Sequence, residues 1–136
     1  MEDKYLFRGK RVRDGEWVVG SPIQSDGMAY IYPKPDTKRN KVLVSAFADV
    51  NIVTLGQCTG LKDRNGTLIF GGDFIKTTTD EDEPEIYRVA FENYSWELRS
   101  PDYNHQKLEG FVNDYTVIEI IGNIYDNDYF ELLKDG

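Results

Sequence analysis

Residues 54–74 read TLGQCTGLKDRNGTLIFGGDF, and this stretch largely decides how the chain folds. Five glycines, at positions 56, 60, 66, 71 and 72, fall within 17 residues. Glycine accepts positive φ and close backbone approach, so this spacing requires several tight reversals in a short segment. Asn65-Gly66 is the pair preferred in a type I′ turn, and Asp63 before it can accept a local backbone hydrogen bond. The stretch therefore predicts compact turn structure.

Short β-prone runs, bounded by turn residues, lie on both sides of this segment. Residues 5–13 and 16–23 flank Asp14-Gly15, which we expect to be a two-residue hairpin connection, and Asp26-Gly27 repeats the device. The last apolar run is nearly continuous, which predicts a strand covered on both faces, with a bulge or bend at Gly122. Further strands are expected at 28–32, 41–45, 51–55, 72–79, 85–91, 94–99 and 116–125. We expect 100–110 to be a loop and 127–133 to close as one helical turn.

The fold class expected from these runs is all-β. No segment longer than about ten residues shows the 3.6-residue stripe of an amphipathic helix. We expect two small β subdomains, residues 1–55 and 56–136, with 56–72 joining them and the second an SH3-like barrel. The apolar residues expected in the core or the subdomain interface are Tyr5, Phe7, Trp17, Val19, Val42, Val44, Ile69, Ile75, Val89, Phe91, Trp96, Val117, Ile120 and Ile124.

Three separated blocks resemble the YopX family of phage proteins. Residues 54–74 are similar to the family pattern around TGLKD-x-NG, Phe7–Gly20 to its opening, and Ile118–Asn127 to its close. Cys58 stands where an aromatic residue is usual, and Gly72 where an acidic one often precedes the aspartate. The resemblance implies one YopX-like unit of phage or prophage origin, and it assigns no catalytic role to any residue.

Length and composition restrict the class of protein. The chain has 136 residues, 40% of them hydrophobic, which is enough to build a core and argues against disorder. It shows neither a membrane-spanning apolar run nor a secretory signal. One cysteine and one histidine exclude a disulfide framework and a zinc site. We expect a soluble protein of the bacterial host cytoplasm.

The residues that could carry chemistry each have a structural interpretation that we favour. Asp80–Glu83 with Glu85 could bind a hard cation, but successive side chains on an extended hairpin tip diverge. Asp73 is expected to accept backbone N–H bonds at the Gly71-Gly72 reversal, and Cys58 to be a small buried hydrophobe. His105 has no neighbouring partner for acid–base work. We therefore expect no catalytic residues, no metal, no cofactor and no enzymatic activity.

Charge is distributed unevenly along the chain. The formal net charge is −8, but residues 1–41 hold nine Lys or Arg and six Asp or Glu, a balance of +3. Basic grooves with stacking aromatics bind single strands, which makes nucleic acid an alternative partner. Equally, a strand at 5–13 with Tyr5 and Phe7 inward and charges outward would be ordinary amphipathic patterning. The candidate residues are Lys4, Arg8, Lys10, Arg11, Arg13, Lys34, Lys38, Arg39 and Lys41.

The favoured function is a non-catalytic module that binds a host or phage protein or regulates it. A nucleic-acid-binding accessory protein is the alternative. The opposite charges of the two parts of the chain, its many Tyr residues and its short strands also predict a homo-oligomer of three or more subunits.

Overall fold

The structure is a computed structural model that describes residues 3–34, 47–92, 94–100, 105–113, 115–128 and 131–132. The chain divides into two compact units, Met1–Leu61 and Lys62–Gly136. Both are built from antiparallel strands, which confirms the expected all-β class and the two β subdomains. Among the described residues, the helical segments are three short 3₁₀ turns and the pair 131–132. No described helix has the length and apolar character needed to span a membrane.

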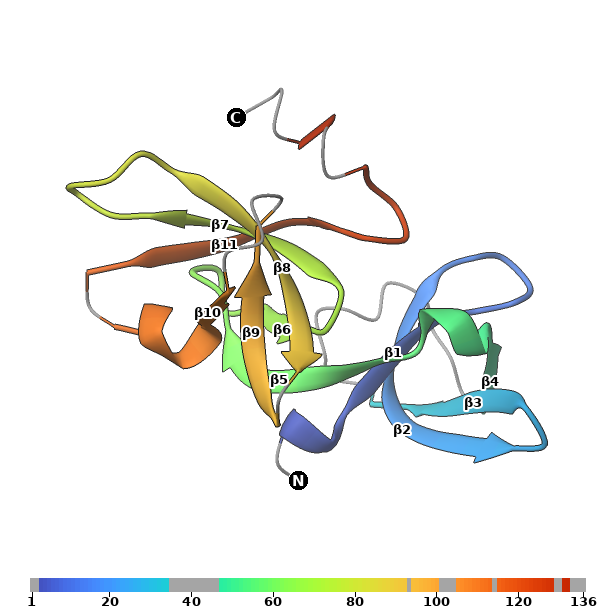
Figure 1. Ribbon diagram of the computed structural model, residues 1–136. Helices are drawn as coiled ribbons and strands as arrows, with labels where there is room; N and C mark the ends of the chain where they lie inside the picture. The colour runs from blue at the N-terminus through green and yellow to red at the C-terminus, as the bar shows by residue number, and fades with distance from the viewer. Residues whose placement is uncertain are drawn as a thin grey trace. The chain divides into compact units, whose positions relative to one another are not determined.

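The strands of unit 1 lie in the order β4-β3-β2-β1-β5 (Figure 1). Their bounds are β1 (Phe7–Lys10), β2 (Trp17–Ser25), β3 (Met28–Pro33), β4 (Ala48–Val50) and β5 (Gly56–Lys62), with the 3₁₀ turns η1 (Asp3–Tyr5) and η2 (Ile52–Thr54). The expected strand at 28–32 is therefore confirmed. The expected strand at 41–45 lies outside the described residues.

The sheet of unit 1 closes on itself. Besides pairing with β3, β4 contacts the segment that follows β1: Arg11 bridges to Val50, and the Val12 N–H donates to the Asp49 carbonyl at 2.8 Å. Closure removes an open strand edge and leaves an enclosed interior. The interior holds the buried cluster Val18, Ala29, Ile31, Ala48 and Val50, with the half-buried Leu55 packed against it.

Two of the expectations for unit 1 were wrong. Residues 51–55 form a 3₁₀ turn, because Asn51 caps it and the Thr54 hydroxyl accepts a hydrogen bond from the distant Lys10 N–H at 2.8 Å. Asp14-Gly15 is not a two-residue connection, since the Gly15 N–H donates to the Arg11 carbonyl in a longer loop. By contrast, Asp26-Gly27 has φ of 53° and 77° between paired Ser25 and Met28, as a type I′ hairpin requires.

Residues 63–67 form the turn between β5 and β6 (Leu68–Phe70). Gly66 has a φ of 76° and donates its N–H to the Asp63 carbonyl at 3.0 Å. Asn65 does not have positive φ, so the expected type I′ turn is wrong. In the observed turn, only Gly66 has a backbone conformation in the left-handed region. The segment 56–72, expected only to join two subdomains, thus contributes two strands.

Unit 2 continues from this turn as an antiparallel sheet of order β10-β9-β8-β7-β11 (Figure 1). Its strands are β7 (Asp73–Thr78), β8 (Glu85–Glu92), β9 (Ser95–Arg99), β10 (His105–Lys107) and β11 (Val117–Asn123), with the 3₁₀ turn η3 (Leu108–Phe111). The strands expected at 72–79, 85–91 and 94–99 are confirmed. The loop expected at 100–110 is wrong for residues 105–110, which form β10 and part of η3. The SH3-like barrel stays a prediction.

The last strand departs from its expected surroundings. Only two residues of β11 are buried, Ile118 and Asn123, so the strand is not covered on both faces. It pairs with β7 at one end of the sheet order. The expected irregularity at Gly122 is confirmed, because the register with β7 shifts between Ile120 and Gly122. Helical backbone at 131–132 agrees with the turn expected at 127–133 for those two residues.

The expected core residues divide by burial. Val19, Ile69, Ile75 and Val89 are fully buried, as expected. Phe7, Trp17, Trp96 and Ile120 are half-buried. Tyr5, Phe91, Val117 and Ile124 are exposed, and for these the expectation was wrong. Val42 and Val44 lie outside the described residues.

Candidate functional site

The structure exposes few of the basic residues that the sequence grouped together. Lys4 and Arg13 are exposed, whereas Lys10, Arg11 and Lys34 are half-buried. Lys38, Arg39 and Lys41 lie outside the described residues. Arg11 is held in an ion pair with Asp14, whose Oδ1 accepts hydrogen bonds from the Arg11 Nε at 3.0 Å and the Glu16 N–H at 3.1 Å. Arg11 and the Glu16 N–H lower the pKa of Asp14 to about 2.

Arg8 is a structural residue rather than a surface cation. Its side chain is fully buried in β1, and its guanidinium lies 4.5 Å from the centre of the Trp17 ring on the paired strand β2. Lys10 reaches the same ring, with its Nζ 5.5 Å from the centre. A cation over an aromatic face gains most when both are removed from water. The expected alternation is therefore reversed here: Arg8 is inside, while Tyr5 is exposed at 59%.

Asp63 joins the turn after β5 to the edge of the sheet in unit 2. Its Oδ1 accepts the N–H groups of Asn65 at 2.9 Å and Thr67 at 3.0 Å, and its Oδ2 accepts that of Ile120 at 3.1 Å. The Arg64 N–H donates in parallel to the Ile118 carbonyl at 2.8 Å. Residues 63 and 64 therefore cover part of the edge that β11 would otherwise present to another strand.

Two further polar residues, Asp73 and Asn123, also accept hydrogen bonds from backbone N–H groups with their side chains. Asp73 is fully buried, and its Oδ2 accepts the Phe70 N–H at 2.8 Å, as expected for the Gly71-Gly72 reversal. The Asn123 Oδ1 accepts the N–H groups of Tyr125 at 2.9 Å and Asp126 at 3.0 Å. Each carboxylate or amide thus replaces a backbone partner at a strand end.

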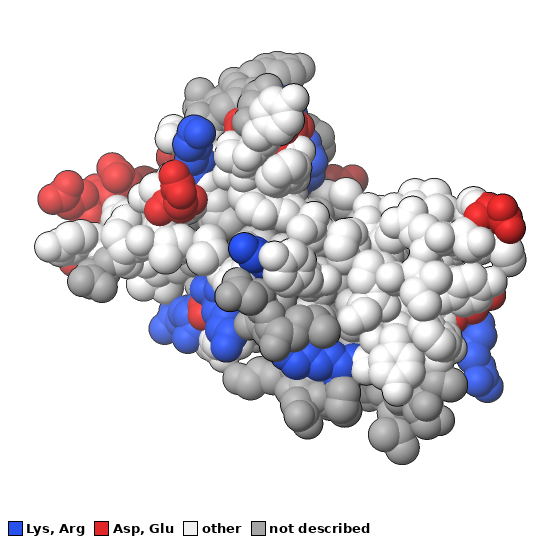
Figure 2. Space-filling model, turned by 90° about the horizontal axis from the view of Figure 1, so that it is seen from below, with Lys and Arg blue, Asp and Glu red and all other residues white. Residues whose placement is uncertain are grey.

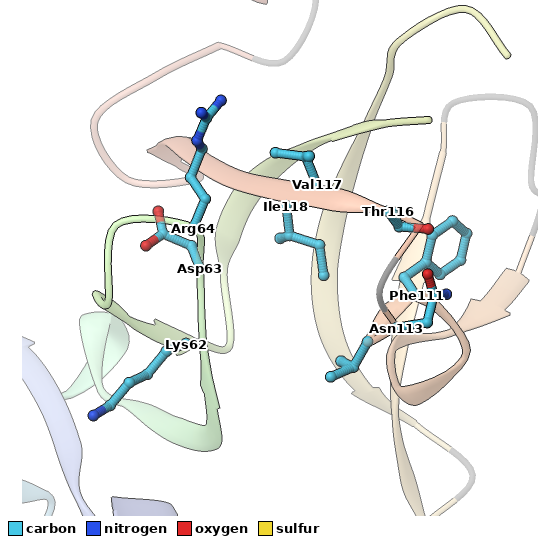
Figure 3. Close-up of a pocket in the computed structure, with 9 residues that line it drawn as sticks. Lys62, Asp63, Arg64, Phe111, Asn113, Thr116, Val117 and Ile118 are labelled. Atoms are coloured by element: carbon cyan, nitrogen blue, oxygen red, sulfur yellow. The ribbon is translucent and has the colours of Figure 1, made fainter. Parts of the chain in front are cut away.

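A surface pocket of about 370 Å³ opens beside Asp63 within unit 2. Figure 3 shows Lys62, Asp63 and Arg64 on one side, and Phe111, Asn113 and Thr116 on the other. The volume falls at the small end of ligand pockets, which span roughly 300–1,000 Å³. Its lining residues are Lys62, Asp63, Arg64, Phe111, Val112, Asn113, Thr116, Val117 and Ile118.

The pocket combines fixed polar groups with apolar surface. Asn113 is used locally, because its Nδ2 donates to the Gly110 carbonyl at 3.2 Å and its Oδ1 accepts the Tyr115 N–H at 2.8 Å. Val112 is 50% exposed and Val117 is 40% exposed. The pocket therefore offers exposed apolar side chains and two exposed cations, Lys62 and Arg64, for contact with another molecule.

The other candidates for chemistry are accounted for by the fold. Residues 80–85 are exposed at the end of the β7–β8 hairpin, where Figure 2 shows acidic side chains gathered. Within the described part of the chain, no group of three or more His, Cys, Asp or Glu comes together in a form that could hold a metal. Cys58 is fully buried, as expected for a structural cysteine. The side chain of His105 lies outside the described residues.

The comparisons with known proteins identify the family. A family model described as YopX protein matches residues 6–134. The chain belongs to the YopX protein family. The YopX match extends over both units, in agreement with the three separated blocks of the sequence.

A solved structure supports the shared fold. The crystal structure of protein yopX from Bacillus subtilis is similar to this YopX-family chain, with a TM-score of 0.54 and 18% sequence identity. The likeness covers 91% of this chain and 95% of that chain. No curated protein matches. At this identity the likeness to the Bacillus protein concerns the fold.

Sequence reasoning missed the pocket of this YopX-family chain. The consecutive Lys62, Asp63 and Arg64 were visible as a charged triplet at a turn, a signal that could have drawn attention to them. Nothing in the pattern placed Val112 or Val117 opposite that turn. Those residues are separated from it by more than 45 positions, so only the folded sheet brings them together.

Proposed function

We propose that the chain is a non-catalytic protein-binding or regulatory module, encoded by a phage or prophage and acting in the cytoplasm of a bacterial host. The observation that supports it best is the pocket of unit 2, whose lining includes exposed Val112 and Val117 together with exposed Lys62 and Arg64. Apolar surface bordered by charged groups is how protein interfaces are composed.

The polar residues of the family pattern support the absence of catalysis in this proposal. Asp63, Asp73 and Asn123 each direct side-chain oxygens at backbone N–H groups. An acid or base for catalysis must instead face a substrate within hydrogen-bond reach. In this proposal, these three residues fix the backbone around the binding surface, and the exposed pocket residues contact the partner.

The nucleic-acid alternative draws on one observation. Lys4 and Tyr5 are both exposed, and the Lys4 Nζ lies 5.3 Å from the Tyr5 ring centre, so a cation and a stacking surface are adjacent. Six candidate cations are described, and of these only Lys4 and Arg13 are exposed. This limited exposure favours the protein-binding function as the first proposal.

Capture from a lysate tests the proposed function. The tagged chain and its Val112→Asp variant are immobilised, incubated with nuclease-treated bacterial lysate, and their bound proteins are identified by mass spectrometry. We expect the same few proteins to be retained by the wild-type chain and by an Arg13→Glu control, and to be lost with Val112→Asp. Retention of proteins from untreated lysate but not from nuclease-treated lysate, or retention that Val112→Asp leaves unchanged, would contradict the proposal.

A further inference from the structure

The charged residues around the pocket of unit 2 indicate which kind of protein segment it binds. The inference from these charges rests on the proposed function. Lys62 and Arg64 are exposed and form no ion pair with any residue in the described ranges. Asp63 between them is 8% exposed, and both of its oxygens accept backbone N–H groups. Among the described residues that line the pocket, the charged groups presented to a ligand are therefore cationic.

The positions of these two cations determine how the acidic groups of a ligand must be spaced. Figure 3 shows the Lys62 and Arg64 side chains extending in opposite directions from the turn, with Ile118 and Val117 on the neighbouring strand. An extended segment lying along the turn would place acidic side chains near the two cations. A side chain that enters the pocket from this segment would meet Val112, Val117 and the buried Ile118, which line it.

The overall charge of the unit does not remove this local preference. Unit 2 carries seven Lys or Arg and 17 Asp or Glu, a balance of −10. At physiological ionic strength, interactions between exposed charges are screened beyond about 8 Å. Contacts at the rim of the pocket are therefore governed by Lys62 and Arg64.

We propose that this pocket binds a linear acidic segment of a protein partner, in which one apolar side chain stands between acidic residues. The apolar side chain occupies the pocket against Val112 and Ile118. Carboxylates on either side of it pair with the Lys62 Nζ and the Arg64 guanidinium. The partner is thus recognised by the order acidic, apolar, acidic rather than by total charge.

Fluorescence anisotropy with defined peptides tests this proposal. The probe is a fluorescein-labelled peptide with one leucine between two pairs of glutamates, and the full chain is titrated into it. The Lys62→Ala/Arg64→Ala variant and the Arg13→Glu control each change the net charge by −2. Exposed ion pairs each contribute modestly, and the double variant removes two of them, so we expect it to bind about five- to tenfold more weakly. The Arg13→Glu control is expected to keep wild-type affinity.

Further peptides separate the contribution of the apolar side chain from that of the acidic side chains. Replacing the leucine by glycine, or the glutamates by lysines, is expected to abolish binding, and salt is expected to weaken it. Equal binding by the double variant, or by the lysine peptide, would overturn the proposal. So would self-association that depends on Lys62 and Arg64 without any peptide binding, because the occupant would then be a second copy. Lysate proteins captured through Val112 without peptide binding would overturn this inference and leave the proposed function standing.

Discussion

Asp63 shows how one residue of the 54–74 stretch connects local turn chemistry to the sheet. Its position before Asn65-Gly66 predicted a local hydrogen bond, and the bonds to the Asn65 and Thr67 N–H groups are of that kind. The bond to the Ile120 N–H joins residues 57 positions apart and could not be read from spacing. Local acceptors are visible in a sequence, whereas long-range ones appear only when strands pair.

Removing the Asp63 carboxylate is expected to destabilise the protein. Asp63→Ala leaves three N–H groups without their acceptor, and we expect the free energy of unfolding to fall by about 3 kcal/mol. Urea unfolding followed by tryptophan fluorescence measures the change. Arg64→Ala is the matched control, because Arg64 contributes its backbone N–H and its side chain is exposed. A loss below about 0.5 kcal/mol for Asp63→Ala, the range of ordinary surface substitutions, would refute this role.

The Arg11–Asp14 pair predicts a pH response at one residue. The pKa of Asp14 is lowered to about 2 from 3.8 by the Arg11 side chain and the Glu16 N–H. Because the folded pKa lies below the unfolded one, the stabilising contribution is present above about pH 4 and is lost as the pH falls through about 2. Carboxyl NMR titration should place the Asp14 midpoint near 2, and Arg11→Ala should move it toward 3.8. A native midpoint near 3.8 would show that the pair does not form.

At the scale of elements, the sequence predicted the positions of most strands, and it predicted their burial and some of the turns poorly. Asp26-Gly27 was correctly expected as a two-residue turn, because positive φ at both positions is a local requirement. The nearly continuous apolar residues of β11 predicted a strand covered on both faces. An apolar run shows that a strand is partly buried, but not that both of its faces are covered, and only Ile118 and Asn123 of β11 are buried. The expected strand at 51–55 was wrong because the Thr54 hydroxyl accepts a hydrogen bond from the N–H of the distant Lys10.

The β2–β3 pairing depends on the missing side chain of Gly20. A Cβ at this position would lie 1.9 Å from the Tyr32 carbonyl oxygen and 2.8 Å from the Pro33 Cα, which are backbone atoms that cannot turn aside. We expect Gly20→Ala to lower the free energy of unfolding by more than about 2 kcal/mol, because the strands must separate to relieve the overlap.

Thermal unfolding of Gly20→Ala and a glycine control checks this expectation. Gly110→Ala is the control, since nothing lies within 4 Å of a Cβ there. We expect the control to melt within a few degrees of the wild-type chain. Equal melting temperatures for the two variants would show that the β2–β3 register does not depend on Gly20.

At the scale of the whole molecule, the candidate site was the hardest part to predict. Composition and spacing indicated the basic residues near the N-terminus, but burial of Arg8 against Trp17 and pairing of Arg11 with Asp14 depend on the fold. The pocket residues come from the end of β5, the turn after it, the end of η3, the connection from η3 to β11, and β11 itself. None of these segments carries a sequence motif of a binding site, so the sequence did not predict that they form a pocket together.

Self-association remains a prediction at this scale. Unit 1 carries nine Lys or Arg and seven Asp or Glu, a balance of +2, against −10 for unit 2, so copies can attract one another head to tail. We expect light scattering at low salt to report a mass of at least three subunits of 15.7 kDa, decreasing as salt is added. A mass near 15.7 kDa that changes with neither salt nor concentration would contradict it.

Site-specific photo-cross-linking most directly tests whether the molecule binds proteins through unit 2. Tyr115, 84% exposed, stands between pocket residues Asn113 and Thr116, and Tyr5, 59% exposed, is a matched aromatic position in unit 1. Benzoylphenylalanine replaces each tyrosine, and the two proteins are irradiated in nuclease-treated bacterial lysate. We expect discrete protein adducts at position 115 and none at position 5. Adducts at position 5 alone, or at neither position, would contradict a protein-binding surface at the pocket.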